Sequence, residues 1–261
     1  MNLIALLCSD SQLSHTLSHF RKASLSCYLH PIMHADMGEV LRSLAPLGFS
    51  GALVLDEAQH ARAYSTAQRS SLDAQEVGAA DTLSVSIGGL LAEYTLGRAV
   101  GATLQNRGWD ARGANVVLLG EGAPARSVCR ELSSLGASHL TVLATNRPTA
   151  EMTSQYAYAA STEITARAYR DPLANAYLSR ADLLIRIDES ADVPTHILGP
   201  HLSVLDFSRQ AMSPLRQSAV SLGAVTLGYR DVQAYQIALG LEQILGSRVN
   251  PHDFLAVLHS L

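Results

Sequence analysis

The chain has 261 residues, of which 48% are hydrophobic and only 16% are charged. Average globular proteins carry roughly 25% charged residues, so this composition excludes intrinsic disorder and predicts one large or two small domains with a well-buried core. The formal charge of -4 comes without a dense basic run, which excludes a nucleic-acid partner. Lys22 is the single lysine among 19 basic residues, so chemistry that needs an amine has few possible sources.

The cysteines and the apolar segments predict the compartment. Three cysteines without a CxxC spacing favour a reducing cytoplasm. Residues 1–8 are apolar but lack a basic flank and are too short for an export signal. No later stretch reaches the roughly 18 apolar residues of a membrane span, so we expect no membrane partner.

The first hundred residues alternate short apolar runs with helical patterns, as βαβ units with a mainly parallel sheet do. The predicted strands are Leu3–Cys8, Ser26–His30, Gly51–Leu55 and Thr82–Ser86. The predicted helices are Leu13–Ala23, Gly38–Leu47, Asp56–Arg69 and Leu96–Asn106. The turn-rich stretch Arg107–Asp110 then predicts a domain boundary.

After this boundary the apolar runs become continuous. Residues 116–119 read Val-Val-Leu-Leu, which is typical of a parallel strand covered on both faces. Further strands are predicted at His139–Leu143, Ile164–Ala168, Ala181–Ile187, Leu202–Asp206 and Ala224–Leu227. Helices are predicted from the glycine-rich stretch after residue 119 to Leu135, and at Pro172–Arg180, Pro214–Leu222, Asp231–Leu245 and Pro251–Leu261.

A glycine-rich pattern, Gly120-x-Gly122-x-x-Ala125, stands between the predicted strand 116–119 and the next helix. In that setting the first glycine permits a tight turn, the second lets the backbone approach a pyrophosphate, and a small third residue permits close helix packing. Ala123 and the other loop residues then offer N–H groups at a helix N-terminus to the anion. A tight strand-to-helix turn with nothing bound is the alternative.

The end of the second strand of such a domain selects the dinucleotide. An acidic residue there binds the ribose 2′-OH of NAD, and an arginine accommodates the 2′-phosphate of NADP. Here the residues are Thr145, Asn146 and Arg147, with no acidic residue before Glu151, so NADP is the expected cofactor. Glu121, inside the loop, places a carboxylate beside the phosphates and opposes binding unless it points away.

Several short stretches together resemble the shikimate dehydrogenase family across nearly the whole chain. They are Gly48–Gly51, Val77–Leu83, Gly120–Arg126, Asn146-Arg147, Ser213–Leu215, Gly223-Ala224 and Gln236–Gly246. The resemblance implies an α/β protein with two domains. An N-terminal α/β substrate domain, residues 1–106 and 236–261, has a mainly parallel sheet, and a Rossmann-type NAD(P)-binding domain spans residues 107–235, with the last helices packing back on the first domain.

The resemblance also implies an activity and a set of residues. The activity is the reversible, NADP-dependent reduction of 3-dehydroshikimate in aromatic amino acid biosynthesis, with a small-molecule substrate held between the domains. Thr16 and Ser18 fit the pair that binds the substrate carboxylate, Asp81 replaces an asparagine of the substrate site, and Gln236 matches a glutamine that contacts the substrate. A helix-capping or exposed role is the alternative for Thr16 and Ser18. A homodimer stays open, and no metal is expected, because His15 and His19 form an HxxxH pair without a third ligand.

The catalytic pair of the family is missing. Gln59 occupies the position of its lysine and Leu96 that of its aspartate. Neither side chain can exchange a proton near neutral pH, and a positioned acid or base contributes about 10²–10⁴-fold to a rate. His60 is the nearest replacement but would point about 100° away from Gln59 on a helix. We therefore expect an NADP-dependent oxidoreductase for a small hydroxylated substrate with the standard reaction in doubt, or an inactive homologue that binds a nucleotide or small ligand for regulation.

Overall fold

The computed structural model describes residues 1–20, 25–32, 36–157 and 161–261. The predicted end of the first helix, with Lys22, lies outside these ranges. The chain divides into two compact units. The first unit comprises residues 1–96 and 233–261, and the second comprises residues 97–232.

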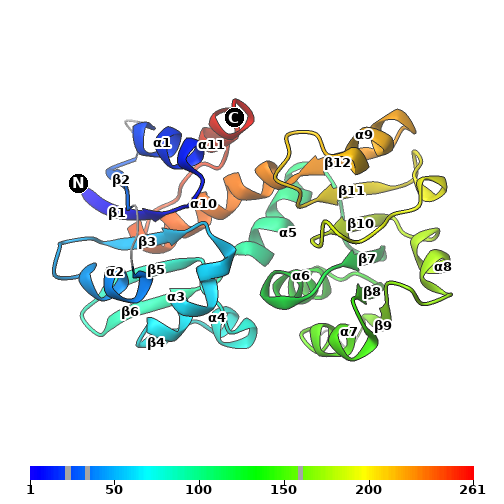
Figure 1. Ribbon diagram of the computed structural model, residues 1–261, viewed down its shortest axis with the longest axis horizontal. Coiled ribbons are helices and arrows are strands. Elements are labelled where there is room, and N and C mark those ends of the chain that lie inside the picture. The colour runs from blue at the N-terminus through cyan, green and yellow to red at the C-terminus, as the bar shows by residue number, and fades with distance from the viewer. Residues whose placement is uncertain (21–24, 33–35, 158–160) are drawn as a thin grey trace. The chain divides into compact units, whose positions relative to one another are not determined.

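The first unit is built on a six-stranded mixed sheet with the order β2-β1-β3-β5-β6-β4 (Figure 1). Its strands are β1 (Asn2–Leu7), β2 (Cys27–Pro31), β3 (Gly51–Val54), β4 (Arg69–Ser70), β5 (Thr82–Ser86) and β6 (Gly89–Glu93). Neighbours pair in parallel except for β5, which is antiparallel to both β3 and β6. The amino end of β5 therefore lies at the same edge as the carboxyl ends of β1, β3 and β6.

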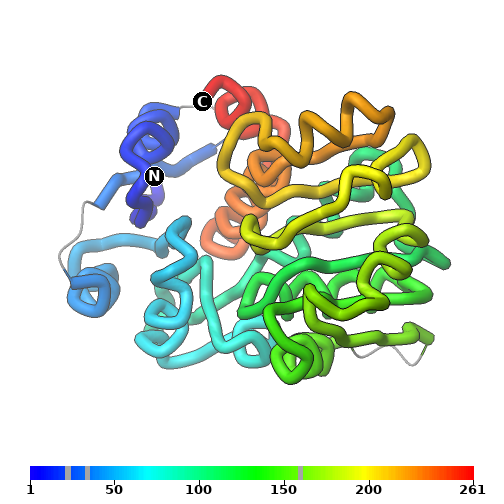
Figure 2. Tube along the Cα trace, turned by 45° about the vertical axis from the view of Figure 1, so that its right-hand side comes forward, coloured from blue at the N-terminus to red at the C-terminus, as the bar shows by residue number. Residues whose placement is uncertain are grey.

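Among the described residues of the first unit, six α-helices contribute to it. They are α1 (Ser11–His19), α2 (Met37–Ser43), α3 (His60–Thr66), α4 (Leu72–Val77), most of α10 (Tyr229–Leu245) and α11 (His252–His259). The last two helices thus return to the N-terminal sheet, as expected. Figures 1 and 2 both place α11 beside α1, where the rings of Phe20 and Phe254 lie 5.0 Å apart.

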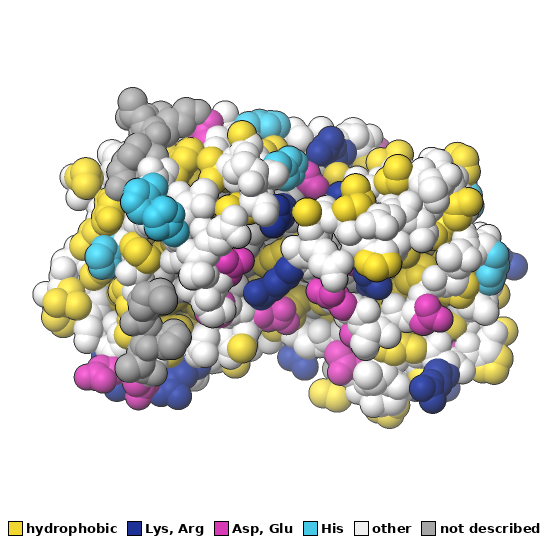
Figure 3. Space-filling model, turned by 45° about the horizontal axis from the view of Figure 1, so that its top comes forward, with side chains coloured by type: hydrophobic (Ala, Val, Ile, Leu, Met, Phe, Trp, Pro, Cys, Tyr) yellow, Lys and Arg dark blue, Asp and Glu magenta, His cyan; other side chains and the backbone are white. Residues whose placement is uncertain are grey.

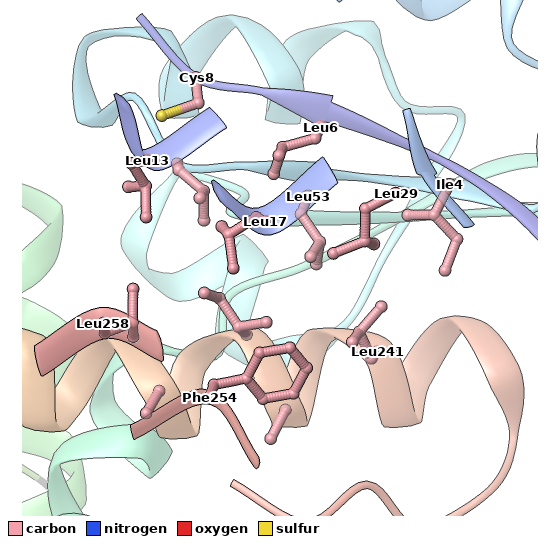
Figure 4. Close-up of a cluster of buried hydrophobic side chains, with 14 of the residues drawn as sticks. Ile4, Leu6, Cys8, Leu13, Leu17, Leu29, Leu53, Leu241, Phe254 and Leu258 are labelled. Atoms are coloured by element: carbon pink, nitrogen blue, oxygen red, sulfur yellow. The ribbon is translucent and has the colours of Figure 1, made fainter. Parts of the chain in front are cut away.

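One hydrophobic cluster joins these elements. Leu6 and Leu53 on the sheet, Leu17 on α1, Leu241 on α10 and Phe254 on α11 are each 0–1% exposed (Figure 4). Burying a Leu or Phe side chain contributes about 2 kcal/mol, so this cluster fixes the C-terminal helices on the first sheet. Gly240 permits this approach, because a Cβ there would lie 2.6 Å from Leu53 Cδ2.

The second unit is a doubly wound parallel sheet with the order β12-β11-β10-β7-β8-β9. Its strands are β7 (Asn115–Leu119), β8 (His139–Ala144), β9 (Glu163–Ala168), β10 (Leu183–Arg186), β11 (Ser203–Asp206) and β12 (Val225–Gly228). Its helices are α5 (Leu96–Asn106), α6 (Gly122–Ser134), α7 (Arg147–Ser154), α8 (Ala174–Leu178) and α9 (Pro214–Ser221). Residues 116–119 are 0–2% exposed, which confirms a strand covered on both faces.

The division between the units falls at residues 96/97 and 232/233, whereas the sequence predicted 106/107 and 235/236. Helix α5 accounts for the first difference, because it packs against α6. A Cβ on Gly97 would lie 2.4 Å from the carbonyl oxygen of Ser127, and one on Gly101 would lie 2.3 Å from Glu131 Oε1. Two glycines one turn apart therefore let α5 lie directly on α6.

On the face shown in Figure 3, described basic and acidic side chains are interspersed among uncharged ones. Among the described residues, no helix is both long enough and apolar enough to cross a membrane.

Candidate functional site

The six strands of the second sheet are parallel, so their carboxyl ends share one edge. In open parallel sheets this edge is where ligands bind. The loop after β7 brings Gly120 and Gly122 to it, the loop after β8 brings Asn146 and Arg147, and the loop after β10 brings Asp188.

The glycine-rich loop forms a tight turn between β7 and α6. A Cβ on Gly120 would lie 2.8 Å from the Cβ of Ile187, so only glycine permits this approach of the loop to the end of β10. Gly122, the first residue of α6, has φ +79°, which side chains disfavour. Ala125 is fully buried, and Ala123 is half-buried in the first turn. The side chain of Glu121, which precedes the helix, makes no capping bond, so it does not engage the first N–H groups of α6.

The two residues expected to select the cofactor lie at the start of α7. Asn146 caps this helix, because its Oδ1 accepts hydrogen bonds of 2.9 Å from both the N–H and the hydroxyl of Thr149. Arg147 is 62% exposed, and its Nε donates to Glu151 Oε1 at 2.7 Å. An exposed ion pair of this kind is weak, so the guanidinium can exchange Glu151 for a ligand.

Two carboxylates, those of Glu121 and Asp188, accept hydrogen bonds at the same edge of the sheet. Glu121 Oε2 accepts hydrogen bonds from the hydroxyl of Thr145 at 2.7 Å and from its N–H at 3.3 Å, which ties the loop after β7 to the loop after β8. Asp188 accepts from the hydroxyl of Tyr169 at 2.9 Å and from Ser190.

The pKa values of Tyr169 and Asp188 shift in opposite directions. Burial, the bond to Asp188 and the charges of Asp188 and Glu121 raise the pKa of Tyr169, which stays a hydrogen-bond donor. Partial burial opposes ionisation of Asp188, but the bonds from Ser190 and Tyr169 and the charge of Arg186 outweigh it and lower the pKa of that carboxyl. This edge therefore carries fixed negative charge beside the glycine loop.

An ion pair with the neighbouring strand β11 stabilises the end of β10. The guanidinium of Arg186 donates to both oxygens of Asp206 at 3.0 and 2.9 Å, and the two residues are register partners on neighbouring strands. Asp206 is fully buried and also accepts from the hydroxyl of Ser213. The pair fixes the residues before Ile187, which packs on Gly120.

In the first unit, Asp81 lies just before β5, at the edge that holds the carboxyl ends of β1 and β3. It is 1% exposed and accepts five hydrogen bonds of 2.8–3.0 Å, all from neutral donors. Thr95 supplies three of them, Thr82 supplies one, and Gln236 Nε2 supplies the last at 2.9 Å. Two of the expected substrate residues, Asp81 and Gln236, are thus in contact with each other.

Thr16 and Ser18 occupy a different setting. Both lie inside α1, where residues two positions apart point about 200° apart. Ser18 is buried and its hydroxyl donates to the carbonyl oxygen of His15 at 2.8 Å, while Thr16 is half-buried. The structure does not bring these two hydroxyls together.

A polar contact that the sequence reasoning missed lies at the same edge. Ser9 lies two residues after the end of β1, and its hydroxyl and N–H donate to Asp56 Oδ1 at 2.7 and 3.0 Å. Asp56 follows β3, so the contact joins the carboxyl ends of two neighbouring parallel strands. Polar residues immediately after predicted parallel strands were the available signal.

The three residues considered for proton transfer are placed as follows. Gln59 ends a 3-10 turn after β3 and is half-buried, and Leu96, the first residue of α5, is 3% exposed. His60 is 5% exposed, its Nε2 lies 2.9 Å from the carbonyl oxygen of Val54, and its ring packs edge-on against Tyr94. Because a carbonyl oxygen only accepts, Nε2 of His60 carries the proton of this bond. The low exposure of His60 shows that its ring faces the protein interior.

The histidine pair of α1 forms no metal cluster. The rings of His15 and His19 lie 4.2 Å apart, and His19 Nδ1 lies 2.8 Å from the carbonyl oxygen of His15. Within the described ranges, no group of three or more His, Cys, Asp or Glu side chains could hold a metal ion.

Comparison with known proteins gives one curated relative and several structures. No protein-family model matches the chain. The NADP⁺-type shikimate dehydrogenase of Dinoroseobacter shibae is 35% identical over 119 residues, which cover 44% of this chain and 42% of that protein. The chain thus matches less than half the length of this curated relative.

The structural matches cover the whole chain. Shikimate 5-dehydrogenase of Listeria monocytogenes, solved with shikimate and NAD, has a TM-score of 0.85 at 18% identity and covers 99% of this chain and 96% of its own. The Thermus thermophilus enzyme, solved with NADP(H) and shikimate, has a TM-score of 0.81 at 17% identity and covers 100% and 99%. At these identities the likeness shows the fold, so the expected two-unit α/β architecture of the shikimate dehydrogenases is confirmed.

Proposed function

We propose that this shikimate dehydrogenase-like chain is an NADP-dependent oxidoreductase that acts on a small hydroxylated substrate. The observation that carries the proposal is the glycine loop of the second unit. Gly120 touches Ile187 where any Cβ would collide, and Gly122 opens a helix with φ +79°. A tight turn alone does not need both features at the edge where dinucleotides bind.

The second unit offers separate contacts for the diphosphate and for the 2′-phosphate of NADP(H). The N–H groups at the start of α6, next to Gly122 and Ala123, would hold the diphosphate. Arg147 would pair with the ribose 2′-phosphate after release from Glu151, next to the cap residue Asn146. The bound cofactor supplies or accepts a hydride.

The first unit supports a substrate site with altered chemistry. Asp81 and Gln236 form a buried pair, in which the carboxylate only accepts and so turns the amide nitrogen of Gln236 toward itself. Gln59 and Leu96 offer no titrating group in the positions of the family's proton-transfer pair. We therefore propose that 3-dehydroshikimate is not the preferred substrate.

The proposal is tested with purified protein, NADPH and a panel of cyclic hydroxylated keto acids. We expect loss of nicotinamide absorbance with at least one of them. The Gly122→Val variant should lose cofactor binding in calorimetry, because its backbone conformation disfavours a side chain. Arg147→Ala should weaken the binding of NADPH. Its matched surface control is Arg180→Ala, since Arg180 is exposed and precedes β10 at the opposite edge of the sheet. No turnover with any substrate would refute an enzymatic role.

An inactive, ligand-binding homologue is the second candidate, and Gln59 and Leu96 favour it. In that case Gln59→Lys with Leu96→Asp should create activity that the parent lacks. Because Leu96 is 3% exposed, circular dichroism must show that the variant folds. A Gln59→Lys variant alone, at a half-buried position, keeps the test open if the double variant fails to fold. A parent that already reduces 3-dehydroshikimate would refute this candidate.

We also propose a cytoplasmic location, which rests on the small, odd number of cysteines (Cys8, Cys27 and Cys129) and on the absence of a CxxC spacing in the sequence. A homodimer stays open, and light scattering of the purified chain decides it.

A further inference from the structure

The position of the Glu121 carboxylate bears on the choice of dinucleotide. Glu121 belongs to the loop after β7, yet its Oε2 lies 2.7 Å from the hydroxyl of Thr145 and 3.3 Å from its N–H. Thr145 is the first residue after β8. The carboxylate therefore lies at the end of the second strand of the unit, although the sequence there carries no acidic residue.

This is where a dinucleotide fold distinguishes NAD from NADP. A carboxylate at the end of the second strand normally accepts hydrogen bonds from the adenosine ribose and repels a 2′-phosphate. We infer that Glu121 supplies this carboxylate from the neighbouring loop and so determines the cofactor specificity of this chain. The inference rests on the proposed function, because it assumes that a dinucleotide binds at the glycine loop.

The charges at this corner oppose one another. A phosphate monoester carries about -1.5 to -2 charge at pH 7. Arg147 attracts it, but Glu121 repels it, and Glu151 already holds Arg147 at 2.7 Å. The charge of Glu121 also helps to raise the pKa of Tyr169, so this carboxylate affects other groups at the same edge of the sheet. The native chain should therefore prefer the phosphorylated adenosine ribose by less than Arg147 alone would provide.

The probes are adenosine 2′,5′-bisphosphate and adenosine 5′-monophosphate, which differ only in the 2′-phosphate, measured by titration calorimetry. The variant is Glu121→Gln, whose amide oxygen can still accept from Thr145. We expect it to bind the bisphosphate about tenfold more tightly, because the repulsion is removed, and to bind the monophosphate no more tightly than the native chain does, because a neutral amide is a weaker acceptor for the ribose hydroxyl. Arg147→Ala should weaken the bisphosphate alone.

Glu163→Gln is the matched control. Glu163 is 73% exposed and lies at the amino end of β9. The Glu163→Gln variant therefore removes the same charge as Glu121→Gln, but from the opposite edge of the sheet. It should leave the ratio of the two affinities unchanged.

Each outcome distinguishes between the two proposals. Binding of both probes with a ratio that Glu121→Gln does not change overturns the inference and leaves the proposed function standing. An equal effect on both probes means that Glu121 only ties the two loops together, and it also overturns the inference. Binding of neither probe by the native chain overturns the proposed function and the inference together.

Discussion

Asp206 offers the sharpest test of how the second unit holds its ligand-binding edge. Its side chain is 0% exposed, and the side chain of Arg186 is 12% exposed. The two bonds between them, at 3.0 and 2.9 Å, form a bidentate pair across neighbouring strands. Asp206→Ala removes the acceptor and leaves the guanidinium buried without its counter-charge.

The expected cost follows from that burial. Removing one partner of a buried ion pair typically costs about 3–5 kcal/mol, because the remaining charge is uncompensated. We expect Asp206→Ala to lower the free energy of unfolding of the second unit by about 4 kcal/mol. Replacing both residues, Arg186→Met with Asp206→Leu, should restore stability to within about 1 kcal/mol of the parent, because no charge is left buried.

Urea denaturation followed by tryptophan fluorescence measures this effect. Trp109 is the single tryptophan of the chain and lies in the second unit, so its signal reports that unit. Asp192→Ala, at an exposed position in the loop after β10, is the control and should change stability by less than about 0.5 kcal/mol. A loss below about 1 kcal/mol for Asp206→Ala, or a double variant as unstable as the single one, would refute the reasoning.

Three further outcomes follow from local geometry. Gly240→Val should destabilise the first unit by about 2 kcal/mol, because its Cβ would lie 2.6 Å from Leu53 on β3 and 2.7 Å from Thr82 on β5. Thermal denaturation measures this effect, and an unchanged melting temperature would contradict it. The bonds from Arg112 lower the pKa of Asp110 from 3.8 to about 2, so the stabilisation is present above about pH 4 and is lost as the pH falls through about 2. Titration by NMR should find this low pKa in the parent and a higher pKa in Arg112→Ala, which keeps only the bond from the backbone N–H of residue 112, and equal values in both would contradict it. Burial raises the pKa of the Cys129 thiol, so a thiol reagent should label half-buried Cys27 first and Cys129 only in urea, as peptide mass mapping can show.

The strands that the sequence predicted well are those whose pattern is local. A continuous apolar run such as residues 116–119 needs burial on both faces wherever it lies. Strand β6 was missed because it begins with Gly89, a residue typical of turns, and β4 was missed because it has only two residues. Helix α7 was also missed, although Asn146 as cap and Pro148 in the first turn are both helix-start signals.

The candidate site also contains one part that a local sequence pattern predicts and other parts that depend on contacts between distant residues. The glycine loop could be recognised because its residues are adjacent in sequence and act through the backbone. The contact between Asp81 and Gln236 joins residues 155 positions apart, and no local pattern predicts it. The bond between Glu121 and Thr145 spans 24 positions and depends on two loops meeting at one sheet edge.

This division has a functional consequence. A backbone-based anion site needs only small residues and a helix N-terminus, so it tolerates sequence change as long as the glycines remain. Proton transfer needs particular side chains, and replacing one of them with a residue that cannot exchange a proton removes it. Cofactor binding and turnover of the usual substrate are therefore separable in this fold. Measuring dinucleotide affinity before activity is then the informative order, because a tight complex without turnover distinguishes an altered substrate site from the loss of both sites.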